Sequence, residues 1–236
     1  MVLRYLKEKR KELAMYTHFL KRLFDIIIGL IALPFVLLII LIFAPIIYFT
    51  DRGPVFYNAP RLGKGGKVYK MYKLRSMYVN SPDIKNADGS TYNGENDPRV
   101  TPIGRFMRKT SIDELPQFLN ILFGHMSLIG PRPHLTQNYK GYDLLDEPHQ
   151  KRLKVRPGVT GYSQAYFRNS ITSEKKLEND VYYVEHLTMW LDIKILFKTA
   201  FSVLKRENIY VTDDIKTAEA KAGEEAKEES KEPVAK

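Results

Sequence analysis

The chain has 236 residues, of which 44% are hydrophobic, so it is long enough to bury one core. It contains no cysteine, which excludes disulfide bonds, thiolate catalysis and zinc–thiolate sites. Lys and Arg (37) outnumber Asp and Glu (27), and the formal net charge of +10 favours an anionic partner such as nucleic acid, nucleotide phosphates or anionic lipid.

Residues 1–22 are basic, and we expect a lead-in helix that lipid headgroups attract. Within 23–50, the run from Ile26 to Thr50 carries no charged side chain, and it is long enough for the roughly 20 residues of a membrane-crossing helix. The run exceeds the roughly 7 to 15 apolar residues of a signal peptide, and no small-x-small cleavage site follows. We therefore expect this segment to stay attached.

Both flanks of the apolar run are basic, so the positive-inside rule draws both ends to the cytoplasmic side. Pro34 and Pro45 interrupt the run, and a proline removes a backbone hydrogen bond at which a helix can bend. We predict that 23–50 forms a re-entrant helix-break-helix hairpin, which makes the chain a monotopic membrane protein. The alternative is a tilted single span with a proline kink.

Residues 51–210 are predicted to form one cytoplasmic domain of the α+β class, predominantly helical with a small β-hairpin or sheet. Alternating apolar residues after the glycine cluster at 63–66 predict the hairpin, and 104–123 has helical spacing. The amphipathic stretch 174–210 is either an interfacial helix or an ordinary core helix, and the two can coexist. The charged tail, 211–236, has almost no large apolar residue, which predicts disorder.

Two adjacent acids, Asp113 and Glu114, follow the cations Arg108 and Lys109. Taken alone, the spacing of Ser111 and Glu114 fits a capping box at a helix start. The chemical interpretation is that amides and cations hold a phosphate there, that one acid attacks phosphorus, and that its neighbour holds a divalent metal such as Mg²⁺.

Two loops add arginines: Arg132 in GPRP and Arg156 in RPG are candidate phosphate-binding forks. The ordinary alternative is that either one pairs with an acid such as Asp143 or Asp180.

The order of these motifs strongly resembles the monotopic phosphoglycosyl transferases, also called bacterial sugar transferases, in their small single-domain form. The resemblance extends from about Lys21 to Arg206. It rests on the stretches KRLFD (21–25), GPVFY (53–57), YKLRSM (72–77), DPRVTPIGRFMRKTSIDELPQFLNIL (97–122), MSLIGPRP (126–133), RPGVTGYSQ (156–164) and DVYYV (180–184).

The resemblance implies that Asp113 attacks the sugar-proximal phosphorus of a UDP-sugar and releases UMP, while Glu114 helps to hold Mg²⁺. Polyprenol (undecaprenyl) phosphate then takes up the sugar phosphate in a ping-pong reaction that starts a surface glycan. The enzyme would work at the cytoplasmic face of a bacterial membrane, and a homodimer is left open. Further residues matching family positions for phosphate binding or site organisation are Lys73, Arg75, Arg108, Arg132 and Asp180, with Gln164 and Arg168 as lining residues.

Two features depart from the family pattern. Many members break the membrane hairpin at a central Ser-Pro, whereas here Pro34 falls earlier and follows Leu33. The usual TGWAQ-type motif reads TGYSQ at 160–164, and Tyr166 to Arg168 replaces the common Asn-Gly-Arg. The position of the hinge and the sugar preference are therefore expected to differ.

Two other classes of protein compete with this interpretation. A non-catalytic membrane-anchored module that binds nucleotide or lipid explains the basic charge but not the Asp-Glu pair between cations and arginine loops. Nucleic-acid binding has only the charge in its favour, because no nucleic-acid-binding motif is present, so no nucleic-acid partner is expected.

Overall fold

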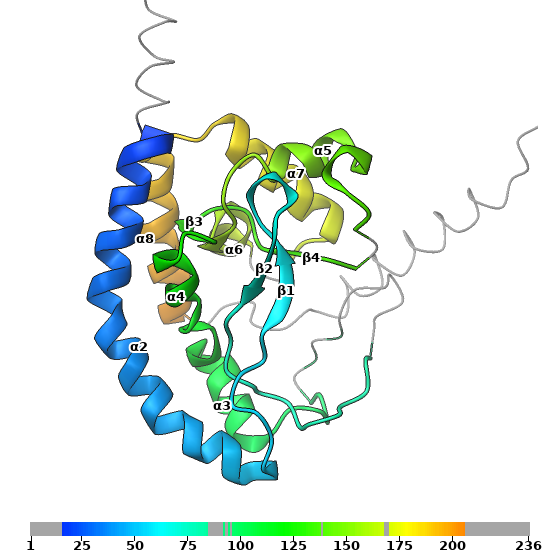
Figure 1. Cartoon of the computed structure of the whole chain (residues 1–236). Helices are drawn as coiled ribbons and strands as arrows, with labels where there is room; N and C mark the ends of the chain where they lie inside the picture. Colours follow the sequence, from blue (N-terminus) through cyan, green and yellow to red (C-terminus); the bar gives the residue numbers. More distant parts are fainter. Residues whose placement is uncertain are drawn as a thin grey trace, which may run out of the picture.

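The computed structural model describes residues 16–84, 92, 94, 96–137, 139–167 and 170–205. Most of the predicted lead-in helix and the whole predicted disordered tail lie outside the described residues. The order of elements confirms a mostly helical α+β chain, with one long apolar helix ahead of a domain built from short strands and helices (Figure 1).

The long helix, α2 (Lys21–Asp51), follows a π-helical turn at Tyr16–Leu20. It runs without interruption through Pro34 and Pro45, and Figure 1 shows it as one curved ribbon. The break expected at a proline is therefore absent, because the helical turns on either side tolerate the loss of a single backbone hydrogen bond. By length and composition α2 could cross a membrane. Only 17% of its most apolar 18-residue stretch is buried against the rest of the chain, so most of that stretch is exposed.

One stripe of α2 packs against the rest of the chain. Its buried residues are Asp25, Gly29, Val36, Phe43 and Ile47, at spacings that keep them on one side of a helix. Gly29 permits a close approach, because a Cβ at this position would lie 2.7 Å from Cδ2 of Leu122. The large apolar residues on the other faces are exposed, among them Leu30, Ile31, Phe35, Leu41 and Phe49.

The domain after α2 contains two small sheets. Strand β1 (Ala59–Leu62) pairs antiparallel with both β2 (Val68–Met71) and β4 (His134–Leu135), which confirms the predicted hairpin. Strands β3 (Ser127–Ile129) and β5 (Gly158–Thr160) form a parallel pair. The helices are α3 (Pro102–Thr110), α4 (Gln117–Leu122), α5 (Glu147–Arg152), α6 (Tyr162–Tyr166), α7 (Ser173–Glu185) and α8 (Met189–Lys205).

Two predicted helices are divided in the structure. The segment 104–123 is split into α3, a 3₁₀ turn (Ile112–Glu114) and α4, because Ser111 adopts a left-handed conformation that ends α3. The segment 174–210 is split into α7 and α8 by the residues between Glu185 and Met189.

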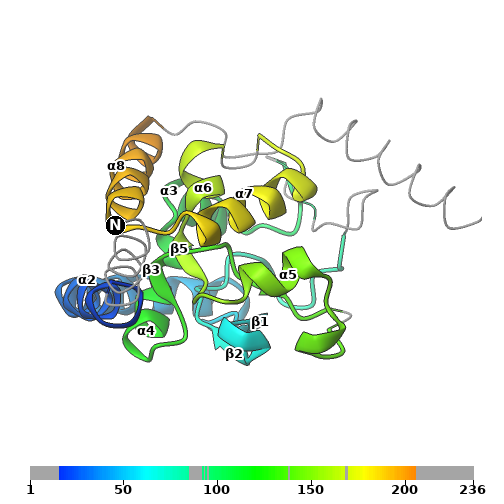
Figure 2. The ribbon, with the colours of Figure 1, turned by 90° about the horizontal axis from the view of Figure 1, so that it is seen from above.

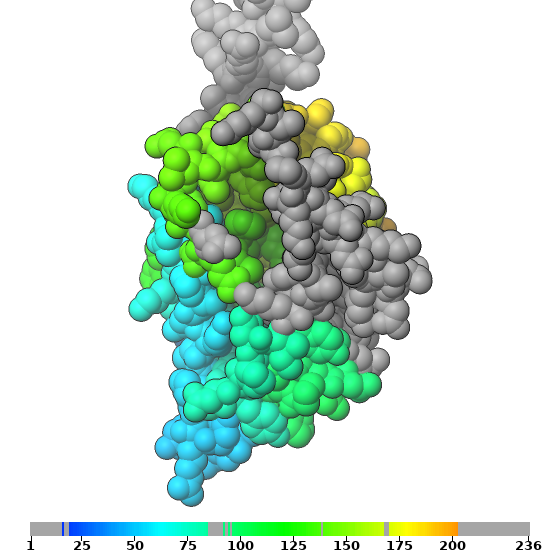
Figure 3. All heavy atoms as spheres, turned by 90° about the vertical axis from the view of Figure 1, so that its right-hand side faces the viewer, coloured from blue at the N-terminus to red at the C-terminus, as the bar shows by residue number. Residues whose placement is uncertain are grey.

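Helix α8 packs in the core on one side, as the core-helix alternative predicts, and exposes large apolar side chains on another. Its Ile195 is fully buried in the core, whereas Trp190 is 64% exposed and Phe197 and Phe201 are also exposed. Figures 1 and 2 place α8 on the same side of the molecule as α2. In the view of Figure 3, the coloured part of the surface belongs mainly to segments that follow α2, and α2 shows only its light-blue end.

Both ends of α2 are tied to the domain that follows it. Near the first end, Oδ1 of the buried Asp25 accepts hydrogen bonds from the Leu128 amide (2.8 Å) and the Ser127 hydroxyl (3.0 Å). At the last residue, both oxygens of Asp51 accept from the guanidinium of Arg75, each at 2.6 Å. Helix and domain therefore form one packed unit.

We expect Arg75→Met to lower the free energy of unfolding by about 3 kcal/mol, because it leaves a partly buried carboxylate without its bidentate partner. Arg75→Lys retains the charge without the fork and should show a smaller loss. Chemical unfolding of the detergent-solubilised protein measures both. The control is Arg105→Met, which removes an exposed arginine of α3; equal effects at 75 and 105 would contradict the proposed tie.

Candidate active site

The two adjacent acids lie on a turn that the backbone forces away from the axis of α3. Ser111 ends this helix with φ of 57°, and its amide donates to the carbonyl of Arg108 (3.3 Å). Asp113 and Glu114 follow in the 3₁₀ turn. The capping-box alternative is wrong, because Ser111 makes no side-chain cap and the Glu114 side chain contacts Lys73 instead.

Lys73 bridges the two acids. Its Nζ lies 2.9 Å from Oδ2 of Asp113 and 3.1 Å from Oε1 of Glu114. Asp113 is buried, with a 2% exposed side chain, whereas the Glu114 side chain is 30% exposed. One ammonium therefore balances two carboxylates, one enclosed and one open to solvent.

The backbone on both sides of Lys73 is fixed to the segment that carries the acids. The amide of Leu74 donates to the carbonyl of Asp113 (2.9 Å). The amide of Tyr72 donates to Oδ1 of the fully buried Asn120, whose Nδ2 donates to the carbonyl of Lys70, both at 2.8 Å. Sequence reasoning missed Asn120, because an isolated Asn in a helical stretch gives no signal of a distant strand.

The charges in this site reinforce one another. The ammonium of Lys73 lowers the pKa of Glu114 to about 2, against an opposing effect of burial, and the charges of Arg132 and Arg108 act in the same direction. Burial tends to lower the pKa of Lys73, but the nearby carboxylates of Glu114 and Asp113 raise it overall. Glu114 and Lys73 are therefore both charged at neutral pH.

Guanidinium groups lie around Glu114. Arg108, in the last turn of α3, donates from Nε to the hydroxyl of Ser76 (2.9 Å). Arg132 is exposed, and its charge reaches Glu114. Arg61 on β1, which the sequence reasoning missed, also interacts with Glu114, although burial lowers its pKa overall. This is a concentration of positive charge that suits a phosphate or diphosphate.

A second buried pair supports the GPRP loop. Nη2 of Arg152 lies 2.6 Å from Oδ2 of Asp180 and donates to the carbonyl of Arg132 (2.9 Å). Burial raises the pKa of Asp180 to about 6, although the charges of Arg152 and Arg132 oppose this. Asp180 thus holds Arg152 in place, and Arg152 in turn binds the backbone of the GPRP loop. Sequence reasoning missed Arg152, because it lies in a run of basic side chains.

Four other predicted site residues remain, and the three that the structure describes have different surroundings. Arg75 makes hydrogen bonds to Asp51 and to three backbone carbonyls, so protein acceptors engage its donors. Arg156 donates from Nε to the carbonyl of Gly124 (2.8 Å) and lines a separate cavity. Gln164 lies on α6 with both amide atoms buried, and neither is hydrogen-bonded within the described part of the chain. The fourth, Arg168, lies outside the described residues.

Asp113 and Glu114 also match the ligands that a protein usually supplies to Mg²⁺. Mg²⁺ is commonly held by one or two carboxylates together with substrate phosphates, and Glu114 offers an ionised, partly exposed carboxylate beside Asp113. Across the described ranges there is no group of three or more His, Cys, Asp or Glu placed to hold a metal ion. Any metal would therefore need ligands from the substrate or from water.

Comparison with known proteins agrees with the motif order. Residues 16–206 match the family model described as bacterial sugar transferase. The chain therefore belongs to the bacterial sugar transferase family, as its motifs predicted.

Two similar proteins are named for an activity, and a third is uncharacterized. A UDP-glucose:undecaprenyl-phosphate glucose-1-phosphate transferase of Klebsiella pneumoniae is 40% identical over 80% of this chain and 41% of that protein. An undecaprenyl-phosphate galactose phosphotransferase of Salmonella typhimurium is 39% identical over 82% of this chain and 42% of its own length. The chain thus spans about two fifths of these relatives. An uncharacterized sugar transferase of Bacillus subtilis, EpsL, is 41% identical over 86% of this chain and 96% of its own length.

The left-handed turn at Ser111 leads to a test of how the acids are positioned. Ser111→Gly should be tolerated, because glycine adopts positive φ without steric cost. Ser111→Val should lower the free energy of unfolding by about 1–3 kcal/mol, because a β-branched residue is strained at this φ. Chemical unfolding compares the two variants, and a valine variant as stable as the glycine variant would contradict the assigned turn.

Proposed function

We propose that this chain is a phosphoglycosyl transferase that moves a sugar 1-phosphate from a UDP-sugar to polyprenol phosphate and releases UMP. The observation that carries the proposal is the buried Asp113, held beside Glu114 by Lys73 and faced by a group of guanidiniums, in a member of the bacterial sugar transferase family. Relatives named as undecaprenyl-phosphate sugar phosphotransferases support the same substrate class.

The proposed reaction has two displacements at one phosphorus. A carboxylate oxygen of Asp113 forms a bond to the sugar-proximal phosphorus as the bond to UMP breaks, and UMP leaves with the electron pair. An oxygen of polyprenol phosphate then attacks the same phosphorus. The aspartate oxygen departs as a carboxylate, and the product is a polyprenyl diphosphate sugar.

The surrounding side chains position the reactants and stabilise charge. Lys73 orients both carboxylates and offsets the charge that accumulates as a diphosphate approaches them. Arg108 and Arg132 are placed to bind the phosphate oxygens, while Arg152 and Asp180 hold the backbone of the GPRP loop. Mg²⁺ held through Glu114 would neutralise part of the diphosphate charge.

The contacts at the two ends of α2 support a monotopic placement in the membrane. Asp25 near one end of α2 and Asp51 at the other are both bonded to one domain. A helix that crossed the bilayer with that domain on one side would have to break one of these ties. The basic residues at both flanks favour the cytoplasmic side for both ends.

An apolar surface is available to enter the lipid. Helices α2 and α8 lie on the same side of the molecule (Figure 2), and both expose large apolar side chains, among them Phe35, Leu41 and Phe49 of α2 and Trp190 and Phe197 of α8. Burying such surfaces in the interfacial region of the bilayer is favourable. The site would then act close to the membrane, where polyprenol phosphate is confined.

Asp113→Asn should abolish UMP release, because an amide cannot replace the carboxylate nucleophile. Glu114→Gln should still form the phosphosugar adduct, but more slowly by about 10²-fold or more. Incubation with labelled UDP-sugars and Mg²⁺, followed by UMP assay and peptide mass mapping, measures both effects.

Asp143→Asn removes an exposed acid outside the site and serves as the matched control. Thermal unfolding of each variant separates loss of chemistry from loss of folding. An adduct on Glu114, or full turnover by a folded Asp113→Asn, would refute the assigned nucleophile.

The topology is tested by cysteine labelling, which is clean because the chain has no native cysteine. Lys9→Cys and Lys67→Cys place single thiols before and after α2. We expect that a membrane-impermeant maleimide labels neither position in intact cells and both after permeabilisation. Labelling of one position alone in intact cells would indicate a transmembrane helix and refute the monotopic proposal.

A further inference from the structure

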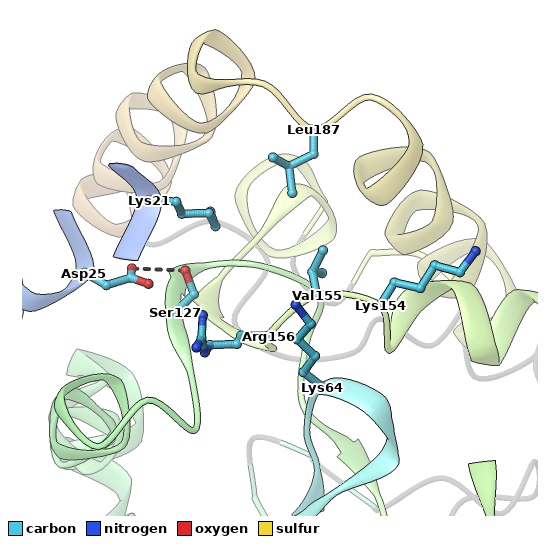
Figure 4. A pocket seen from close by; sticks show the side chains of 8 residues that line it. All are labelled: Lys21, Asp25, Lys64, Ser127, Lys154, Val155, Arg156 and Leu187. Atoms are coloured by element: carbon cyan, nitrogen blue, oxygen red, sulfur yellow. Dashed lines mark hydrogen bonds between the residues drawn. The ribbon is translucent and has the colours of Figure 1, made fainter. Parts of the chain in front are cut away.

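A cavity of about 220 Å³ lies between the start of α2, the tip of the β1–β2 hairpin and the segment before β5 (Figure 4). The charged residues of its lining are four cations and one acid. They are Lys21, Lys64, Lys154 and Arg156, with Asp25. This excess of positive charge is not used by the reaction proposed above.

The hairpin separates this cavity from the two acids of the candidate active site. Lys73 lies at the base of the hairpin, where its carbonyl accepts from the amide of Tyr57 (2.8 Å). Leu62 and Val68 pair at the other end of β1, and Lys64 lies beyond them. The four residues of β1 alone extend about 13 Å, so a group bound at Lys64 lies well away from the carboxylates near Lys73.

The walls of the cavity are held by backbone contacts. The amide of Gly65 at the hairpin tip donates to the carbonyl of Leu153 (2.8 Å). Gly66 packs closely on Tyr139, because a Cβ at this position would lie 2.1 Å from the Tyr139 hydroxyl oxygen. The bond from Nε of Arg156 to the carbonyl of Gly124 fixes the plane of the guanidinium. The cations are thus presented on a braced frame.

Two of the positive charges facing the cavity, those of Lys64 and Arg156, form no ion pair within the described part of the chain. Figure 4 shows Lys64 extending from the hairpin to the side of Val155, and Arg156 extending towards Ser127, whereas Lys154 extends away from both. Among the described residues, no carboxylate forms an ion pair with Lys64 or Arg156, Lys21 is paired with Asp192, and Oδ1 of Asp25 is engaged by two protein donors. An anion in the cavity would be attracted to the ammonium of Lys64 and the guanidinium of Arg156.

The position of the cavity indicates the source of such an anion. Lys21 and Asp25 belong to the first turns of α2, which also expose Leu23 and Phe24. On the other side, the lining residue Leu187 comes just before α8 begins, and Trp190 is exposed on the first turn of α8. The cavity therefore lies where two helices with exposed apolar side chains begin. If these helices enter a membrane, the cavity faces the lipid headgroups.

We infer that this cavity binds the phosphate group of an anionic membrane lipid. The bound lipid differs from the acceptor polyprenol phosphate, because the acceptor must reach Asp113. The site would fix the start of α2 against the membrane surface, and it does not depend on the transfer chemistry.

The test uses the full chain in detergent, titrated with short-chain phosphatidylglycerol, short-chain phosphatidylcholine or inorganic phosphate, without UDP-sugar. Native mass spectrometry counts the bound molecules. Lys64→Gln should weaken phosphatidylglycerol binding about tenfold, because it removes one charge-assisted contact. The matched control is Lys67→Gln, an exposed lysine on the same hairpin outside the cavity, which should change binding by less than about twofold.

The arms of the titration distinguish the outcomes. A loss of phosphatidylglycerol affinity confined to Lys64→Gln supports the site. A loss confined to inorganic phosphate would assign the cavity to a soluble phosphate and overturn the lipid source. Equal effects of the two variants, or equal wild-type affinity for phosphatidylcholine and phosphatidylglycerol, would overturn the site as an anionic-lipid site. None of these outcomes bears on UMP release.

Discussion

The structure depends on the attachment of both ends of one long apolar helix to a single domain. Asp25 near the start of α2 and Asp51 at its end are bonded to residues of β3 and to Arg75. Because the helix lies along the domain, its buried stripe contributes to the core and its other faces stay exposed. The exposed apolar surface of α2 and the packing of the domain are therefore parts of one arrangement.

The candidate active site likewise depends on a small number of charged contacts. One lysine bridges two carboxylates, and its backbone neighbours on both sides are bonded to the segment that carries them. A left-handed serine turns those carboxylates out of α3. Such preorganisation suits the proposed phosphoryl transfer, because catalysis of that reaction class consists largely of positioning and electrostatic stabilisation.

Periodicity and motif order predicted much of this molecule. The apolar helix, the β1–β2 hairpin and the family were predicted correctly, since each leaves a local pattern in the sequence. The split of 104–123 was missed, because Ser111 has no residue-type signal for positive φ. Arg75 was assigned to phosphate, yet its guanidinium is engaged by Asp51 and backbone carbonyls. Arg152 and Asn120 were overlooked because their partners lie far away in sequence.

By itself, the sequence determined the apolar helix, its basic flanks, the adjacent acids and the family, because these are matters of composition and short-range order. Only the tertiary structure decided that α2 continues through both prolines, that Lys73 joins Asp113 to Glu114, and that Arg156 lies in a different cavity. Those outcomes depend on contacts between residues distant in the chain. A local pattern shows which side chains are present, but packing decides which of them meet.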